Sequence, residues 1–245
     1  MLDLEINELS RIEAISLRDL KRINQEARNF QMDLILIGGY AIRAFTRERS
    51  WRFTKDIDFI TTRRDLMALR GMFDLFGYDF ERTDFGVKGS KRIDSESIEL
   101  YISVDKVIDW STGLEYKLPL DAFAKANRIK VKAFLKDNKD LETDAMVAPI
   151  EDVLAMKLMT ERIRDHFDAI ALIFDSFAML DTRRFWTNCE KSSLKQHMKK
   201  RLESLLADTK RGLVRKIWKE FTGMDLIRAQ EVTLKEKIAS LLAKS

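Results

Sequence analysis

The sequence of 245 residues contains very few of the residues that build disulfides, zinc sites and tight turns. Its single cysteine, Cys189, excludes a disulfide within the chain, and with only two histidines a zinc site of Cys and His ligands cannot be assembled. Two prolines and nine glycines argue against a collagen-like, low-complexity or turn-rich all-β protein. We therefore expect many helices and a limited set of strands.

The sequence also lacks the features of export and membrane insertion. Residues 1–5 are acidic and do not form the basic, then apolar, start of a signal peptide. No stretch approaches the roughly 18 uninterrupted apolar residues of a membrane span. We expect a soluble, cytoplasmic protein with no membrane partner, and the lone cysteine agrees with a reducing compartment.

Charge is distributed unevenly along the chain. The formal net charge is +4, but residues 1–145 carry −1 and residues 146–245 carry +5. Within residues 191–219, ten Lys and Arg side chains stand against only Glu203 and Asp208. Such a basic segment predicts binding to a polyanion such as RNA, although a solvated helix face gives the same pattern.

Hydrophobic periodicity divides the chain into two parts. The first part has apolar or alternating runs typical of strands at 34–37, 56–60, 78–82, 98–105, 129–134 and 141–147. Helices are expected at 9–30, from about Tyr40, and at 64–76, with a turn region at 86–89. The second part predicts only helices, at 150–162, 164–178, 182–206, 210–221 and 231–243. The pattern indicates an α+β fold, with a sheet domain over 1–148 and a basic helical domain over 149–245.

Two short elements in the sheet domain have the chemistry of a phosphate and metal site. Gly38 and Gly39 end a buried strand and begin a helix, so backbone N–H groups can approach a phosphate closely there. Asp56 and Asp58 alternate in the next strand and point to the same side, where two carboxylates can hold hard cations. Each element alone also has a purely structural explanation. The glycines can form a tight turn required by packing, and the acids can lie on a solvent-exposed strand face.

Together these elements resemble the nucleotidyltransferase superfamily that includes polymerase β-like and kanamycin-type enzymes. Leu36-Ile37-Gly38-Gly39 is similar to its hydrophobic-Gly-Gly/Ser element, and Asp56-Ile57-Asp58-Phe59 to its Asp-hydrophobic-Asp-hydrophobic element. The resemblance implies a mixed sheet flanked by helices and a third acidic metal ligand on a later strand. Glu99 is the natural match, and Asp105, expected on the same strand face, is the reserve candidate.

A second segment resembles the AbiEii branch of nucleotidyltransferase-like toxins from toxin–antitoxin systems. It runs from Pro149-Ile150-Glu151-Asp152 through Lys157 to Asp165 and Asp168. If residues 157–168 form one helix, their charged side chains share one polar stripe. The resemblance implies that Lys157 contacts the triphosphate and that Asp165 orients it. The bland alternative is an exposed helix face with ion pairs such as that of Lys157 with Glu161.

A basic and aromatic connection precedes the aspartate pair. Arg47, Arg49, Arg52 and Lys55 alternate with Trp51 and Phe53 between residues 46 and 55. These side chains can contact phosphates or stack on a base, or else form a solvated loop whose aromatics dock on the core. We assign Lys55 to the nucleotide site.

The resemblance implies transfer of a nucleoside monophosphate from an NTP to an acceptor hydroxyl, with release of pyrophosphate. Asp56, Asp58 and Glu99 would bind two Mg²⁺ ions, or Mn²⁺, and act as catalytic residues. Gly38, Gly39, Lys55, Lys157 and Asp165 would bind the nucleotide. The acceptor would be RNA, such as the tRNA 3′ end, or a protein, and an antitoxin protein would be a partner. The alternative is a catalytically silent nucleotide-sensing or RNA-binding module on the same fold.

Overall fold

The computed structural model describes residues 2–27, 29–62 and 66–245. Within these ranges the chain folds into two compact units that interleave along the sequence. Unit 1 comprises residues 1–44, 53–106 and 120–148, and unit 2 comprises residues 45–52, 107–119 and 149–245. The predicted separation into domains 1–148 and 149–245 stays a prediction. In the structure, two short segments from the first half, 45–52 and 107–119, belong to unit 2.

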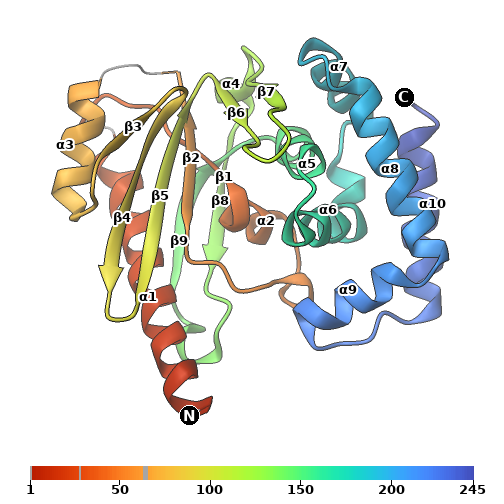
Figure 1. Ribbon diagram of the computed structural model, residues 1–245, viewed down its shortest axis with the longest axis horizontal. Coiled ribbons are helices and arrows are strands. Elements are labelled where there is room, and N and C mark those ends of the chain that lie inside the picture. Colours follow the sequence, from red (N-terminus) through yellow and green to blue (C-terminus); the bar gives the residue numbers. More distant parts are fainter. Residues whose placement is uncertain (1, 28, 63–65) are drawn as a thin grey trace. The chain divides into compact units, whose positions relative to one another are not determined.

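Unit 1 is built on a seven-stranded mixed sheet with the order β3-β4-β5-β2-β1-β9-β8 (Figure 1). The strands are β1 (Ile35–Ile37), β2 (Ile57–Thr61), β3 (Glu81–Thr83), β4 (Gly86–Ile93), β5 (Glu96–Val104), β8 (Asn127–Lys132) and β9 (Glu142–Val147). The pairs β1–β9 and β2–β5 are parallel, and the other neighbours are antiparallel. The prediction of a mixed sheet flanked by helices is confirmed.

The helices of unit 1 are α1 (Leu2–Glu26), α2 (Gly38–Phe45), α3 (Leu66–Phe76) and α4 (Ala122–Lys125). Helix α1 packs against β9 and β5 and contacts α3. Its apolar side chains recur with helical period, so Ile12, Leu20 and Ile23 are fully buried. For the helix predicted at 64–76, residues 64 and 65 lie outside the described residues.

The turn predicted at residues 86–89 is wrong, because both glycines lie inside β4. A Cβ atom on Gly86 would lie 2.2 Å from the carbonyl oxygen of Ile102, and one on Gly89 would lie 1.9 Å from that of Asp79. These glycines therefore allow two backbone segments to approach closely within the sheet, rather than reversing the chain.

Unit 2 contains the helices of the C-terminal half and a small hairpin. Its elements are the strands β6 (Lys106–Ile108, of which Lys106 belongs to unit 1) and β7 (Glu115–Lys117), and the helices α5 (Ile150–Met159), α6 (Ile163–Ser176), α7 (Thr182–Lys191), α8 (Lys195–Lys210), α9 (Leu213–Thr222) and α10 (Arg228–Leu242). Helix α5 is buried along its whole length and contacts α6, α7 and α8. None of the described helices has the length and apolar composition needed to cross a membrane.

Two predicted helices of the C-terminal half are divided in the structure. The helix expected at 182–206 is two helices, α7 and α8, because the chain turns at Ser193, which adopts a left-handed conformation with φ 59°. Residues 157–168 are likewise not one helix, since α5 ends at Met159 and α6 begins at Ile163.

A buried ion pair joins α1 to the rest of unit 1. Arg43 of α2 donates to Glu13 of α1 at 2.8 Å, and both side chains are almost completely buried. Glu13 also accepts hydrogen bonds from the backbone N–H groups of Phe134 and Leu135 at 2.8 and 2.9 Å, and from the side chain of Asn138 at 3.3 Å. One carboxylate therefore satisfies donors from two separate segments, α2 and residues 134–138.

Replacing Glu13 with alanine should destabilise the protein strongly, because it leaves the Arg43 guanidinium buried without its carboxylate. We expect the free energy of unfolding to fall by about 3–5 kcal/mol, measured by urea denaturation. The matched control is Glu142→Ala, which breaks the exposed ion pair with Lys130 in the same unit. Equal losses in the two variants would contradict the structural role of Glu13.

Candidate active site

The glycine pair lies directly against one of the two aspartates. Strand β1 runs antiparallel to β2 with Ile37 opposite Asp58, and the chain leaves β1 at Gly38 with φ +69°. A Cβ atom on Gly38 would lie 2.0 Å from Oδ2 of Asp58, and one on Gly39 would lie 2.6 Å from Oγ1 of Thr54. Residue 38 must therefore be glycine both for its backbone conformation and for the space that the Asp58 carboxylate occupies.

The register of β2 against β5 places the acidic residues on one face. Asp58 lies opposite Tyr101, and Ile57 lies opposite Leu100, with both of these apolar side chains fully buried on the other face. The backbone N–H of Glu99 donates to the Asp56 carboxylate at 3.3 Å. Asp58 and Glu99 therefore lie on the same side of β2 and β5, and Asp56, which immediately precedes β2, contacts the backbone of Glu99.

The pKa of Tyr101 reflects the negative charges of these three acids. Burial raises the pKa of its phenol, and the negative charges of Glu99, Asp56 and Asp58 raise it further. The sequence analysis did not select Tyr101, although its alternation with Glu99 at a period of two residues predicts that both lie on the same strand face. The phenol is 36% exposed, so it forms part of the surface beside the acids.

The three acids are oxygen donors of the kind that Mg²⁺ prefers, but their carboxylates do not converge on one metal position. Across the described ranges, no group of three His, Cys, Asp or Glu side chains is placed to hold a metal ion. Mg²⁺ usually takes only one or two protein carboxylates and completes its shell with water and substrate phosphates. Two carboxylates are enough for such a site. The metal-binding assignments of Asp56, Asp58 and Glu99 stay predictions.

The reserve candidate, Asp105, does not continue the strand face of Glu99. Strand β5 ends at Val104, and Asp105 adopts a left-handed conformation with φ 64°. Its backbone N–H donates to the carbonyl of Thr61 at 2.9 Å. The prediction that it lies on the same face is therefore wrong, because the chain bends before it.

Lys55 is held by two partners in unit 1. Its ammonium pairs with the carboxylate of Glu96, and its carbonyl accepts a hydrogen bond from the hydroxyl of Ser16. The hydroxyl of Ser16 in turn accepts from the buried phenol of Tyr40 at 2.8 Å. These bonds fix the backbone immediately before Asp56, and the nucleotide-binding role of Lys55 stays a prediction.

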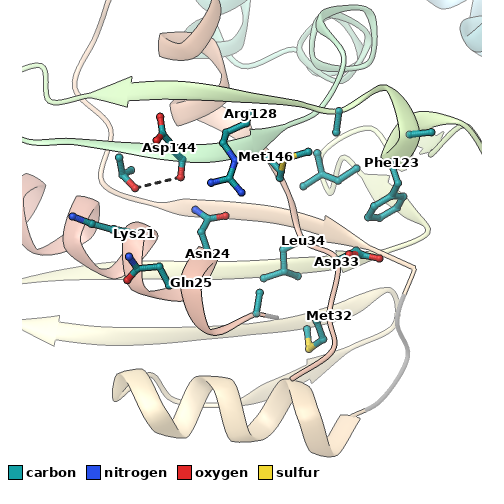
Figure 2. Close-up of a pocket in the computed structure, with 15 residues that line it drawn as sticks. Lys21, Asn24, Gln25, Met32, Asp33, Leu34, Phe123, Arg128, Asp144 and Met146 are labelled. Atoms are coloured by element: carbon teal, nitrogen blue, oxygen red, sulfur yellow. Dashed lines mark hydrogen bonds between the residues drawn. The ribbon is translucent and has the colours of Figure 1, made fainter. Parts of the chain in front are cut away.

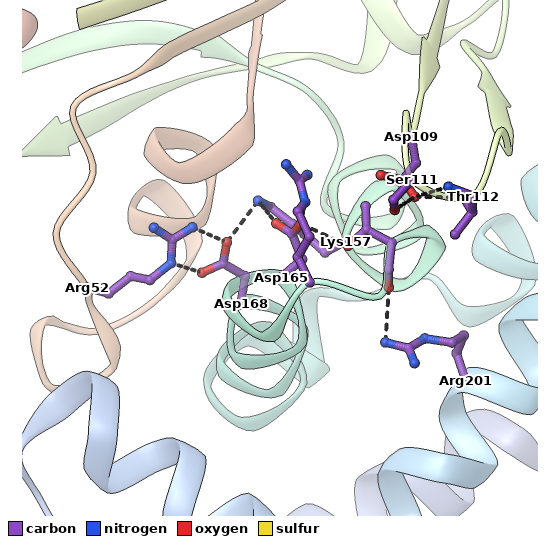
Figure 3. Close-up of polar contacts among 10 residues, drawn as sticks. Arg52, Asp109, Ser111, Thr112, Lys157, Asp165, Asp168 and Arg201 are labelled. Atoms are coloured by element: carbon purple, nitrogen blue, oxygen red, sulfur yellow. Dashed lines mark hydrogen bonds and ion pairs between the residues drawn. The ribbon is translucent and has the colours of Figure 1, made fainter. Parts of the chain in front are cut away.

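Unit 2 contains a buried ionic cluster around Lys157 (Figure 3). The Lys157 ammonium lies 2.6 Å from the carboxylate of Asp165 and 2.8 Å from that of Asp168. The break between α5 and α6 produces this arrangement, since Thr160 donates its hydroxyl to Asp165 at 2.8 Å. The prediction of a polar stripe along one helix is therefore wrong. Lys157 of α5 pairs with two aspartates of α6 and not with Glu161.

Two arginines surround this cluster. Arg52 binds both carboxylate oxygens of Asp168, at 2.8 and 2.7 Å, and Arg162 lies 2.6 Å from Asp165. The basic connection that contains Arg52 therefore docks on α6 within unit 2. Trp51, also in that connection, is buried and donates its indole N–H to the Thr46 carbonyl at 3.0 Å, so this aromatic side chain serves packing.

Electrostatics favour the charged forms of Lys157 and Asp165. Burial alone lowers the pKa of Lys157, but the carboxylates of Asp168 and Asp165 outweigh it and raise that pKa above its ordinary value. Burial raises the pKa of Asp165, yet Lys157, Arg162 and the hydrogen bonds to its carboxylate lower it to about 2. Thr160 and Arg162 were not selected from the sequence, because their role depends on the helix break.

A separate pocket of about 550 Å³ opens in unit 1 at the other end of β1 from Gly38 (Figure 2). Its walls come from the end of α1, the segment before β1, and strands β8 and β9. Its polar lining includes Lys21, Asn24, Asp33, Arg128 and Asp144. None of the predicted site residues lines it, so it is distinct from the face that carries Asp56 and Asp58.

Comparison with known proteins identifies the class of this protein. The family described as "Nucleotidyl transferase AbiEii toxin, Type IV TA system" matches residues 20–237. The protein is a nucleotidyltransferase by class. It belongs to the AbiEii family of toxins from type IV toxin–antitoxin systems, which confirms the resemblance drawn from the motifs.

Two solved structures are similar to this chain. The crystal structure of JHP933 from Helicobacter pylori matches with a TM-score of 0.48 and 15% identity, over 98% of this chain and 92% of that chain. The solution structure of the antibiotic-resistance factor ANT(2'')-Ia matches with a TM-score of 0.35 and 15% identity, over 86% of this chain and 100% of that chain. No curated protein matches the sequence.

Substituting Gly38 tests the close contact with Asp58. Gly38→Ala introduces left-handed strain of about 1–2 kcal/mol and forces the Asp58 carboxylate to move, at a further cost of roughly 1–3 kcal/mol. Gly77→Ala is the matched control, because Gly77 has φ +71° and its Cβ would meet no atom within 4 Å. Urea denaturation should show a larger loss in the free energy of unfolding for Gly38→Ala than for Gly77→Ala. Equal losses would mean that the Asp58 carboxylate can move away from residue 38 without destabilising the protein.

The Asp165 carboxylate should contribute stability that depends on pH. Its pKa is about 2 in the folded protein against an ordinary value of 3.8. The unfolded chain therefore binds more protons between these values, and the stability from Asp165 is complete above about pH 4 and lost as the pH falls toward 2.

The variant Asp165→Asn should lose this contribution, roughly 2 kcal/mol at neutral pH, and should show a flatter dependence of unfolding free energy between pH 4 and 2. Asp225→Asn removes an exposed carboxylate of unit 2 and serves as the control. A parallel pH profile for parent and Asp165→Asn would contradict the low pKa.

Proposed function

We propose that this nucleotidyltransferase transfers a nucleoside monophosphate from an NTP to an acceptor hydroxyl and releases pyrophosphate, as the toxin of a toxin–antitoxin pair. The observation that carries the proposal is the contact between Asp58 and Gly38, with Asp56 and Glu99 on the same face. A carboxylate that binds metal and a backbone that approaches phosphate are then adjacent. This is what a metal-bound triphosphate requires.

Asp56 and Asp58, with Glu99 beside them, would hold Mg²⁺, and Mn²⁺ would serve in its place. When bound, the metal supplies charge neutralisation for the triphosphate and lowers the pKa of the attacking hydroxyl. The three side chains are oxygen donors of the type that these ions prefer. Glu99 would also accept the proton of the acceptor hydroxyl.

The backbone of Gly38 and Gly39 would cradle the phosphates. Both residues belong to the first turn of α2, whose N–H groups lack partners within the helix and carry its positive dipole end. Neither residue has a Cβ atom, so an oxygen can approach the backbone closely. The carboxylate of Asp58 packed against Gly38 would bring the metal to the same phosphates.

Lys157, Lys55 and Asp165 complete the proposed nucleotide-binding set. An ammonium group has three N–H donors, of which Asp165 and Asp168 use two on Lys157. The third donor would bind a phosphate oxygen. Asp165 would then act by orienting Lys157, which is the role that the contact at 2.6 Å supports.

We place the acceptor on the basic helices of unit 2 and propose RNA, such as the tRNA 3′ end, ahead of a protein. Lysine side chains on α8 and α9 are exposed at Lys199, Lys200, Lys210 and Lys216. A surface of this charge binds phosphate backbones through release of counterions. The type IV family implies an antitoxin as a further partner.

A catalytically silent nucleotide-sensing or RNA-binding module is the second candidate. The observation that favours it is the lack of a three-residue metal-binding group among the described residues. It predicts binding of NTP or RNA without turnover that depends on Mg²⁺. The two candidates therefore differ in catalysis and agree in binding.

The deciding experiment incubates the protein with Mg²⁺, each labelled NTP in turn, and total RNA. We expect label to enter RNA with the parent, and transfer to fall at least about 10²-fold in Asp56→Asn and in Asp58→Asn, because each substitution removes a charge that supports the reacting phosphate. Asp74→Asn, on the exposed side of α3, is the control and should retain parental activity.

Label transfer that survives both substitutions would contradict the metal assignment. Binding of NTP or RNA by the parent with no transfer from any NTP would instead support the silent module. Label found in protein rather than RNA would change the acceptor and leave the metal site intact.

A further inference from the structure

The pocket of unit 1 is a concave site that the proposed reaction does not use. Its volume of about 550 Å³ lies in the range of cavities that hold small organic molecules. All the residues that line it belong to unit 1, so the pocket is formed within a single compact unit. It reaches β1 at Leu34 and Ile35, whereas Gly38 follows the other end of that strand.

One end of the pocket is positively charged. Lys21 and Arg128 line this cationic end, and among the residues that the structure describes neither side chain has a hydrogen-bond or ion-pair partner. The Arg128 guanidinium points from β8 toward the side chain of Asn24 on α1 (Figure 2). Asn24 is held in place by a hydrogen bond from its amide to the Leu20 carbonyl at 2.8 Å. The cationic end therefore presents positive charge and N–H donors to an anionic group.

Two carboxylates also line the pocket, and their positions limit the charge of a ligand. Asp144 lies directly opposite Lys130 in the register of β8 and β9, where the two opposite charges attract each other. Asp33 lies on the side of Phe123, away from the cationic end (Figure 2). A second negative charge on the ligand would be repelled by Asp33. The pocket thus favours a ligand with one anionic group, bound at the cationic end.

The remaining walls are largely apolar. Met32, Leu34, Phe123 and Met146 line the part of the pocket away from Lys21 (Figure 2). Met32 and Leu34 are buried, and Phe123 and Met146 are half-buried. Two flexible thioether side chains and an aromatic ring can pack against apolar bodies of different shapes. An inorganic anion would leave these walls without contact.

We propose that this pocket binds a small organic anion, with one carboxylate or phosphate group at the cationic end and an apolar body against the methionines. The charged and apolar walls lie on different sides of the pocket. This separation matches an amphipathic molecule better than inorganic phosphate or a neutral hydrocarbon. The inference goes beyond nucleotidyl transfer and does not depend on it, because none of the proposed catalytic or nucleotide-binding residues lines the pocket.

NMR of isotope-labelled methionine methyl groups tests the site directly, because Met32 and Met146 line the pocket and Met179 of unit 2 does not. The two pocket signals are assigned as those lost in Met32→Leu and Met146→Leu. The full-length protein is titrated with octanoate, phenyl phosphate, inorganic phosphate and octanedioate. We expect octanoate, phenyl phosphate or both to shift the pocket signals until they saturate. Met179 is 61% exposed, so it reports unspecific surface binding and should not shift.

The head group and the number of charges are read from the same titrations. A response to octanoate alone assigns a carboxylate, and a response to phenyl phosphate alone assigns a phosphate. Octanedioate carries a carboxylate at each end, so we expect it to bind roughly 5- to 10-fold more weakly than octanoate. Asp33→Asn should narrow this difference, because it removes the charge that repels the second carboxylate.

Variants on β8 test the cationic end. Arg128→Gln should bind octanoate and phenyl phosphate about 10- to 100-fold more weakly, the scale of a charge-assisted hydrogen bond. Lys132→Gln removes a cation from the same strand but outside the pocket, so it is the matched control and should bind like the parent.

The inference is overturned if neither octanoate nor phenyl phosphate shifts the pocket signals, if Met179 shifts at the same concentrations, or if Arg128→Gln binds as tightly as the parent. Shifts of equal size with inorganic phosphate would show that the apolar walls contribute nothing, and binding of octanedioate as tight as that of octanoate would contradict the single anionic group. Label transfer is measured separately, so its absence would contradict the proposed function and leave this site unaffected.

Discussion

Helix α5 is buried on every side, and the organisation of unit 2 depends on this constraint. All ten of its residues are buried, including Glu151, Asp152 and Lys157. A buried charge is tolerated only when partners surround it, so the neighbouring elements must each supply one. Asp152 accepts from Tyr116 of the hairpin at 2.6 Å and from Asn188 of α7 at 2.8 Å, while Lys157 pairs with two aspartates of α6. The charges of α5 thereby determine how the hairpin, α6 and α7 pack around it.

The same requirement decides which groups remain available to a substrate. Arg43 follows the glycine pair by only four residues, yet its guanidinium is committed to Glu13 and serves the fold. The backbone N–H groups of Gly38 and Gly39 lie in the first turn of α2, where they have no partner within the helix. Within unit 2 the buried Lys157 is shared between two carboxylates, whereas Arg162 keeps more than half of its side chain exposed. Accessible cations therefore lie at the edge of the buried network and not at its centre.

Strands and side-chain orientation were predictable from the sequence where they depend on adjacent residues. They were not predictable where a residue distant in the sequence determines the local structure. Alternation at Asp56–Ile60 and around Glu99 is a property of a few adjacent residues, so the strands and their polar face were predictable. The break after Met159 contains neither glycine nor proline, and it is stabilised by the bond from Thr160 to Asp165, which no window of sequence displays.

The Lys157 cluster contains residues that the sequence motif had grouped on a single helix. Lys157, Asp165 and Asp168 lie 8 and 11 positions apart, so they would not touch along one helix, and they make contact because α5 and α6 are separate helices. The difference appears in the electrostatics. On an exposed stripe each charge titrates nearly alone, but in the buried cluster the protonated state of Lys157 depends on Asp165 and Asp168, and the ionised state of Asp165 depends on Lys157. Under the proposed function, a nucleotide phosphate at Lys157 would meet an ammonium group that two carboxylates keep charged, and not an unopposed positive charge.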